Sequence, residues 1–210
     1  MSVDFPLNSE PIDFTPMYAT HNAFRRDLGR LREAVDAGRM DAPGVRAGWA
    51  NFKRQLDVHH SVEDAVLWPS LLRAMADRPV ELALIADMQA EHAHLDPLLA
   101  VVDEAIARRG ANLGACVREL TEVLGDHMQH EEVAVLPLIQ QELTAADWAA
   151  FRSAMARRQG PSGAAVYIPW ILDDVTPEES RAFLGAMPAP VGILNRVAFQ
   201  PLYRRSRLWR

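Results

Sequence analysis

The feature that most constrains the fold is a short pattern that occurs twice, at His59–Pro69 and at His127–Pro137. In each copy a glutamate follows the histidine by four positions, and a proline follows the glutamate by six. Residues four apart lie on one face of an α-helix, one turn from each other. Each copy can therefore direct an imidazole and a carboxylate from a single helix face. The four residues are His59, Glu63, His127 and Glu131.

Four stripes of apolar residues, spaced alternately by three and four, predict four long helices. They span about residues 15–38, 43–69, 79–110 and 113–137. We expect Thr15 to cap the first helix, Pro69 to bend or end the second, and Pro97 to kink the third. Because the connections are short, the predicted fold is all-α, an up-down-up-down four-helix bundle.

The two halves of this bundle repeat one another. His21 and His92 occupy equivalent places in the first and third stripes. Each half is thus a helical hairpin with one histidine on its first helix and one histidine–glutamate pair on its second. The histidines lie at similar distances from the hairpin turns, so we expect all these groups to converge near the end of the bundle away from the turns. The predicted metal ligands are His21, His59, Glu63, His92, His127 and Glu131.

Other polar residues near these positions are harder to assign. His60 and Asp64 form a second pair turned about 100° from the stripe, and we place them around the site or at the surface. His94 is expected to face solvent. The sequence leaves three residues open: His130 flanks the stripe, Tyr18 could be a hydrogen-bond donor or core, and Asp96 could be a ligand, a hydrogen-bond acceptor or exposed.

A purely structural polar core is the alternative to a metal site. Burying two carboxylates without cationic partners is costly, and the stripes carry no lysine or arginine at that height. Bound cations would supply the missing charge. Imidazole and carboxylate without thiolate suit iron, with manganese or zinc as alternatives. Glutamates from opposite hairpins could bridge two ions and leave positions open for dioxygen, peroxide or nitric oxide.

Composition excludes several other classes of protein. The formal net charge of −6 argues against a nucleic-acid binder. Cys116 is the single cysteine, so an internal disulfide or a thiolate-rich metal site is excluded. The sequence has no apolar run long enough to span a membrane and no signal peptide at its start. We therefore expect a cytoplasmic protein with no membrane partner.

Residues 144–210 follow a different pattern from the predicted bundle at 15–143, while 1–14 form an irregular lead-in. We expect a short helix from Thr144 to Arg157, a loop at 160–163, and a capping box at Thr176 that opens another helix. This extension is predicted to pack on the bundle or on a second subunit of a homodimer. Its terminal arginines favour a solvated helix over an anionic membrane or partner surface. They are Arg196, Arg204, Arg205, Arg207 and Arg210.

The ligand pattern over about residues 15–143 resembles the hemerythrin-like (HHE cation-binding) family. The resemblance implies a non-haem di-iron centre in which Glu63 and Glu131 bridge the irons. One iron would be held by His21 and His59, and the other by His92 and His127. The invertebrate oxygen carriers of that family have a fifth histidine four residues after the one on the third helix, where this chain has Asp96. The pattern is closer to the bacterial members, which are linked to oxygen, peroxide or nitric oxide and imply a role in oxidative stress.

Three functions are compatible with such a site. The first is a redox enzyme that turns over a small oxidant. The second is a module that carries, senses or stores oxygen, nitric oxide or iron, and the third is a structural metal bundle. A ferritin-like carboxylate site is disfavoured, because its Glu-x-x-His motif occurs only once, at Glu91–His94. Whether the chain is an enzyme, and which ligand it uses, stays open.

Overall fold

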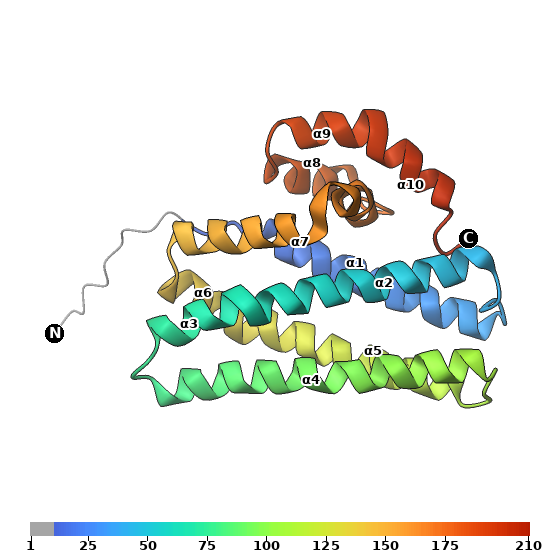
Figure 1. The fold of residues 1–210 in the computed structure, drawn as a ribbon, viewed down its shortest axis with the longest axis horizontal. Helices are drawn as coiled ribbons and strands as arrows, with labels where there is room; N and C mark the ends of the chain where they lie inside the picture. Colours follow the sequence, from blue (N-terminus) through green and yellow to red (C-terminus); the bar gives the residue numbers. More distant parts are fainter. Residues whose placement is uncertain (1–10) are drawn as a thin grey trace.

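The computed structural model describes residues 11–210, and within that range the regular elements are all helices, joined by short turns and loops. Four helices run up and down to form the bundle: α1 (Thr15–Asp36), α2 (Pro43–Val62), α4 (Pro79–Ala107) and α5 (Leu113–His130). Figure 1 shows them side by side, with the two hairpin turns at the same end. The predicted four-helix bundle is confirmed. The expected lead-in lies mostly outside the described residues.

The helix boundaries follow local sequence signals. Proline occupies the first turn of α1, α2 and α4, where its missing N–H costs nothing. Gly38 follows α1 with a φ of +63°, a conformation that glycine adopts without strain. The expected cap at Thr15 is wrong, because Thr15 is already helical. Its backbone N–H instead donates to the Asp13 carboxylate at 2.9 Å.

The two duplicated prolines do not end their helices. α2 continues through a π-helical turn, η1 (Glu63–Leu67), into α3 (Trp68–Ala74). Likewise α5 continues through η2 (Glu131–Val135) into α6 (Leu136–Glu142). Proline cannot donate to the carbonyl four residues earlier and crowds it. In each π turn the glutamate carbonyl accepts from the N–H five residues later, and the helix proceeds past the proline. α4 also continues through Pro97.

The bundle interior contains two apolar clusters. The first lies toward the hairpin turns and includes Phe24, Leu56 and Leu95; the second lies beyond it and includes Met17 and Met88. When α2 and α5 are followed through their π turns into α3 and α6, the predicted ligands on every chain of helices lie between residues of the first cluster and residues of the second. The expectation that they lie at the end of the bundle is therefore wrong. The helices extend past the site, because the π turns let α2 and α5 continue into α3 and α6.

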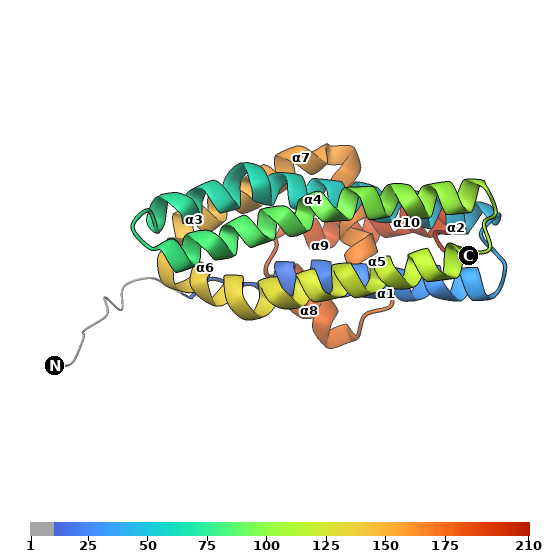
Figure 2. The same ribbon diagram turned by 90° about the horizontal axis from the view of Figure 1, so that it is seen from below.

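The extension packs across α1 and α2. It comprises α7 (Ala145–Ile171), α8 (Pro177–Gly185), α9 (Pro190–Leu194), a π turn η3 (Asn195–Phe199) and α10 (Gln200–Ser206). Figure 2, seen from below, shows α4 and α5 in front and the extension on the opposite side of the bundle. The capping box at Thr176 is confirmed, and Thr144 with Asp147 forms another. The predicted loop at 160–163 is a single kink at Gly160, where φ is +64°.

A buried carboxylate joins the extension to α1. Asp27 is fully buried and accepts a hydrogen bond from the Trp170 indole N–H at 2.8 Å. Arg26 and Arg30 lie 3.0 and 3.4 Å from the same carboxylate. Arg30 also pairs with Asp173 at 2.8 Å, just after α7. This network fixes the second half of α7 against the bundle.

Near its C-terminal end the chain returns to the start of α2. The Trp209 backbone N–H donates to the Gly44 carbonyl at 2.7 Å. A Cβ on Gly48 would lie 2.4 Å from the Trp209 ring, so this close approach requires glycine. The segment between Trp170 and Trp209 is thus attached at both ends. Among residues 11–210, no helix is both long and apolar enough to cross a bilayer.

Candidate metal centre

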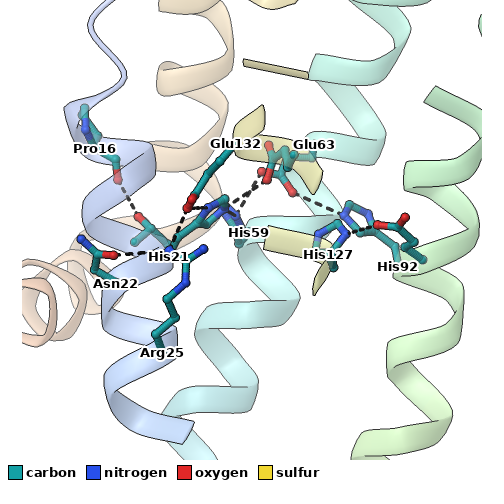
Figure 3. A network of polar contacts seen from close by, with 12 residues as sticks. Pro16, His21, Asn22, Arg25, His59, Glu63, His92, His127 and Glu132 are labelled. Atoms are coloured by element: carbon teal, nitrogen blue, oxygen red, sulfur yellow. Dashed lines mark hydrogen bonds and ion pairs between the residues drawn. The ribbon is translucent and has the colours of Figure 1, made fainter. Parts of the chain in front are cut away.

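Two groups of potential metal ligands lie between the apolar clusters. Figure 3 shows His21, His59, Glu63, His92 and His127 of this region in one network of polar contacts. In the first, ligand atoms of His21, His59 and Glu131 all lie within 4.8 Å of one another. The second contains His92 and His127, together with a residue that the stripe did not include, His60. α1, α2 and η2 supply the first group, and α2, α4 and α5 supply the second. Segments far apart in the sequence thus meet at one level of the bundle.

Glu63 lies between the two groups. One carboxylate oxygen is 3.1 Å from His59 Nε2, and the other is 3.7 Å from His92 Nε2. Glu131 approaches from the start of η2, with one oxygen 3.1 Å from His21 Nε2. The His21 and His59 Nε2 atoms are themselves 3.2 Å apart. The structure therefore brings all six predicted residues together, with the Glu63 carboxylate directed at both groups.

The placement of His60 corrects the prediction that it lies around the site or at the surface. Its side chain stacks on His92, with ring centroids 4.0 Å apart, and meets His127 edge-on at 5.1 Å. Only 9% of the residue is exposed. The spacing of apolar residues did not identify His60 as part of the site, because α2 packs against two neighbouring helices. His59 faces α1 while His60, turned about 100°, faces α4. The sequence signal that could have indicated this role is the pair of adjacent histidines, His59 and His60.

Carboxylates bind the outer ring nitrogens of three predicted ligands: His21, His92 and His127. Glu132 accepts from His21 Nδ1 at 2.8 Å, and Asp64 accepts from His92 Nδ1 at 2.9 Å. Glu91 accepts from His127 Nδ1 at 2.8 Å and from His130 Nδ1 at the same distance. A carboxylate on Nδ1 fixes the imidazole tautomer and leaves Nε2 as the free lone pair. These three rings are therefore oriented with Nε2 toward the interior.

The remaining unassigned residues belong to neither ligand group. His94 and Asp96 are exposed on α4, as expected for His94, so Asp96 takes the exposed alternative. Tyr18 is 43% exposed, which excludes the core alternative. His130 is partly exposed and contacts the centre only through Glu91. Arg25, on α1, binds Glu132 at 2.8 Å without reaching either Glu63 or Glu131.

Burial governs the protonation of the centre. It raises the pKa of Glu63 well above its usual value, with the nearby Glu131 and Asp64 acting in the same direction. Burial opposes ionisation of Glu131 as well, but the nearby His21, His59 and His127 together outweigh it and lower the Glu131 pKa to about 2. Burial and the neighbouring histidines lower the pKa of His59 and of His60. Both imidazoles are therefore favoured in the neutral form, which is the form that binds metals.

The region around this centre matches a known family. A model of the hemerythrin HHE cation-binding domain matches residues 14–139, which is more than half of the chain. The chain belongs to that family. Comparison of the chain with curated proteins and with solved structures found no match. The HHE match ends within α6, before the extension begins.

The residues of this HHE domain fit a cation. Among the described residues, both oxygens of Glu63 and of Glu131 are buried and make no hydrogen bond of good geometry, although one oxygen of each lies 3.1 Å from a histidine Nε2. The Nε2 atoms of His92 and His127 are likewise buried and unpartnered. Leaving so many buried polar atoms unpaired would strongly destabilise a protein that bound nothing there. Cations between the two groups would satisfy the carboxylates and imidazoles together.

Proposed function

We propose that the chain is a non-haem di-iron protein that binds a small oxidant, such as dioxygen, peroxide or nitric oxide, and reacts with it. The observation that carries this proposal is the position of Glu63, whose two oxygens face two separate groups of ligands. A carboxylate so placed can bridge two ions. Imidazole and carboxylate donors without thiolate favour iron, with manganese or zinc as alternatives.

The ligands would divide into two sets. His21 and His59 would hold one ion, and His92 and His127 would hold the other. Glu63 and Glu131 would bridge, although Glu131 lies closer to the first set. His60 adds a further imidazole to the second set. Even with this addition, two six-coordinate ions would keep positions open for a small ligand.

The protein would contribute exclusion of water and fixed orientation. The apolar clusters on either side of the centre keep bulk water away from it. Glu132, Asp64 and Glu91 hold three imidazole rings in place through their Nδ1 atoms. When bound, two iron ions would supply the redox chemistry of the site. This division of roles is suited to turnover of a peroxide or dioxygen substrate.

Reversible binding without turnover is the second candidate, and His60 specifically favours it. The chain has Asp96 where the oxygen carriers have a fifth histidine on the third bundle helix. The structure provides a fifth buried imidazole, although from α2 instead of from the third bundle helix. A site with more protein ligands leaves fewer open positions for a reaction.

One experiment tests the proposal and separates the two candidates. Protein that has not been purified on a metal column is analysed for its elements, and two iron ions per chain are expected. The iron-loaded protein is then mixed with hydrogen peroxide or dioxygen while its optical spectrum is recorded. Sustained consumption of oxidant supports the enzyme, and a stable adduct without turnover supports carriage. Fewer than two metal ions per chain would contradict both.

A further inference from the structure

The C-terminal extension exposes a group of apolar side chains that the metal centre does not use. Among the described residues, eight large apolar side chains are exposed, and four of them lie within ten residues of one another. Their exposed fractions lie between 45% and 62%. The four residues are Ile193, Leu194, Val197 and Leu202. Isolated apolar residues are normal on a surface, but a cluster of this kind indicates an interaction site.

These side chains share one face of a continuous helix. α9, η3 and α10 follow one another without a break, and residues four apart lie in one row. Ile193, Val197 and Pro201 form one exposed row, and Leu194 and Leu202 lie in the row beside it. We call this the outer face. Figure 1 shows α9 and α10 at the margin of the molecule farthest from α4.

The outer face is not exposed through loose packing of the helix. The opposite row carries Asn195 and Tyr203, which are both buried, and Phe199, which is half-buried. Tyr203 donates to Asp173 at 3.2 Å, and Trp209 beyond the helix is bound to Gly44. The helix is thus fixed on the bundle with its apolar outer face directed at solvent.

Charge defines what this face can bind. Glu179 is the last acidic residue, and all six charged side chains after it are arginines, although the whole chain has a net charge of −6. Arg196 and Arg204 form an exposed row beside the apolar rows, and Arg205 continues the row of Pro201. An apolar face flanked by arginines matches the interface of an anionic membrane, where acyl chains and negative headgroups are adjacent.

We propose that the outer face of α9–η3–α10 binds the surface of an anionic lipid bilayer. The apolar rows would enter the headgroup region while the arginines contact lipid phosphates, without any helix spanning the bilayer. A second copy of the chain fits less well. A symmetric dimer through this face would place the arginines of both copies against one another. This revises two expectations from the sequence, a solvated terminal helix and the lack of a membrane partner, because the apolar side chains beside the arginines are exposed.

Vesicle sedimentation of the full chain tests the proposal. The wild-type protein should sediment with phosphatidylcholine vesicles that contain phosphatidylglycerol, and much less with phosphatidylcholine alone. The double variant Ile193→Ser/Val197→Ser should lose about tenfold or more in partition coefficient. Arg204→Gln/Arg205→Gln should show a loss of similar size that shrinks at high salt. Val80→Ser/Val101→Ser is the matched control, because both valines are exposed on α4.

Several results would overturn the proposal. One is the absence of sedimentation with anionic vesicles, and another is equal binding to neutral vesicles. A third is binding that Ile193→Ser/Val197→Ser leaves unchanged. Light scattering on the same samples identifies the other occupant. A wild-type dimer that becomes a monomer in this variant, without vesicle binding, would assign the outer face to a second copy. None of these readouts depends on the metal content of the protein.

Discussion

His60 stacks on His92 with their ring centroids 4.0 Å apart and their planes 15° from parallel. The two rings come from different bundle helices, α2 and α4, and both are buried. Burial lowers the pKa of His60, and the proximity of His92 lowers it further, so a neutral ring is favoured there. A neutral imidazole that packs against the predicted ligands His92 and His127 can itself bind a metal ion.

His60→Ala should reduce the metal content of the purified protein from two ions per chain toward one. The second ligand group would lose one of its three imidazoles, while the first group is untouched. Elemental analysis after dialysis against a weak chelator measures the change. His94→Ala is the control, because His94 is exposed on α4. If His60→Ala kept two ions with unchanged affinity, His60 would have only a packing role.

Glu63→Gln should have opposite effects on stability with and without metal. In a chelator, the substitution removes a buried carboxyl whose pKa is raised well above its usual value by burial, so the cost of burying that ionisable group disappears. We expect a gain of about 1–3 kcal/mol in the free energy of unfolding. In excess iron the wild type should be the more stable protein, since only the carboxylate bridges the ions well. Urea unfolding followed by circular dichroism measures both. A loss of stability in both conditions would contradict this account.

Glu91→Gln should weaken metal binding without changing the number of ions at saturation. Glu91 accepts from the Nδ1 atoms of His127 and His130 and so orients the His127 ring. Loss of such an outer carboxylate typically costs about 10–100-fold in affinity. Competition against a coloured chelator measures the constant. Asp96→Asn, which changes an exposed carboxylate on the same helix, should leave the affinity unchanged.

Asp27→Asn should loosen the extension from the bundle. The buried carboxylate accepts from Trp170 and pairs with Arg26 and Arg30, so neutralising it leaves two cations without a full partner. We expect a loss of about 2–4 kcal/mol in the free energy of unfolding and faster proteolysis within residues 144–210. Asp36→Asn, at an exposed position on the same helix, should change neither. Unchanged proteolysis of Asp27→Asn would show that apolar contacts alone hold the extension.

Gly48→Ala should displace Trp209, because a Cβ would lie 2.4 Å from its ring. The cost of moving the indole should exceed the gain of about 0.5–1 kcal/mol that alanine brings to a helix interior. Gly29→Ala provides the comparison, since nothing lies within 4 Å of its Cβ and stability should rise. Thermal unfolding measures both variants. A rise in melting temperature for Gly48→Ala would contradict the tight contact.

The sequence predicted the bundle well, because apolar periodicity and proline positions are local signals that tertiary packing reinforced. The six predicted ligand residues lie close together for the same reason. Each occupies a position on the helix face that the neighbouring apolar residues define. Whether they ligate metal is for the elemental analysis to decide. Apolar spacing did not identify His60, because one helix can pack against two neighbouring helices and so bury two of its faces. It also failed to predict the π turns, since hydrogen bonding across a proline depends on what the rest of the helix packs against.

The sequence analysis also did not identify the carboxylates that bind the Nδ1 atoms of the ligand histidines. Glu91 and Glu132 lie off the stripes, and a side chain that reaches across to a neighbouring helix leaves no periodic signal in its own helix. The exposed outer face of the extension was missed for a related reason. The spacing of Ile193 and Val197 indicates that they share one face of a helix. Only the structure shows that this face points away from the core.

The separation of the apolar interior into two clusters has a consequence for how the protein unfolds. The polar centre forms a band between them, and without cations that band contributes little cohesion. Each cluster could then melt by itself, and the metal-free chain should unfold over a broader denaturant range than the metal-bound chain. Bound ions would make the two clusters a single cooperative unit, so that iron would set the cooperativity of folding as well as the chemistry.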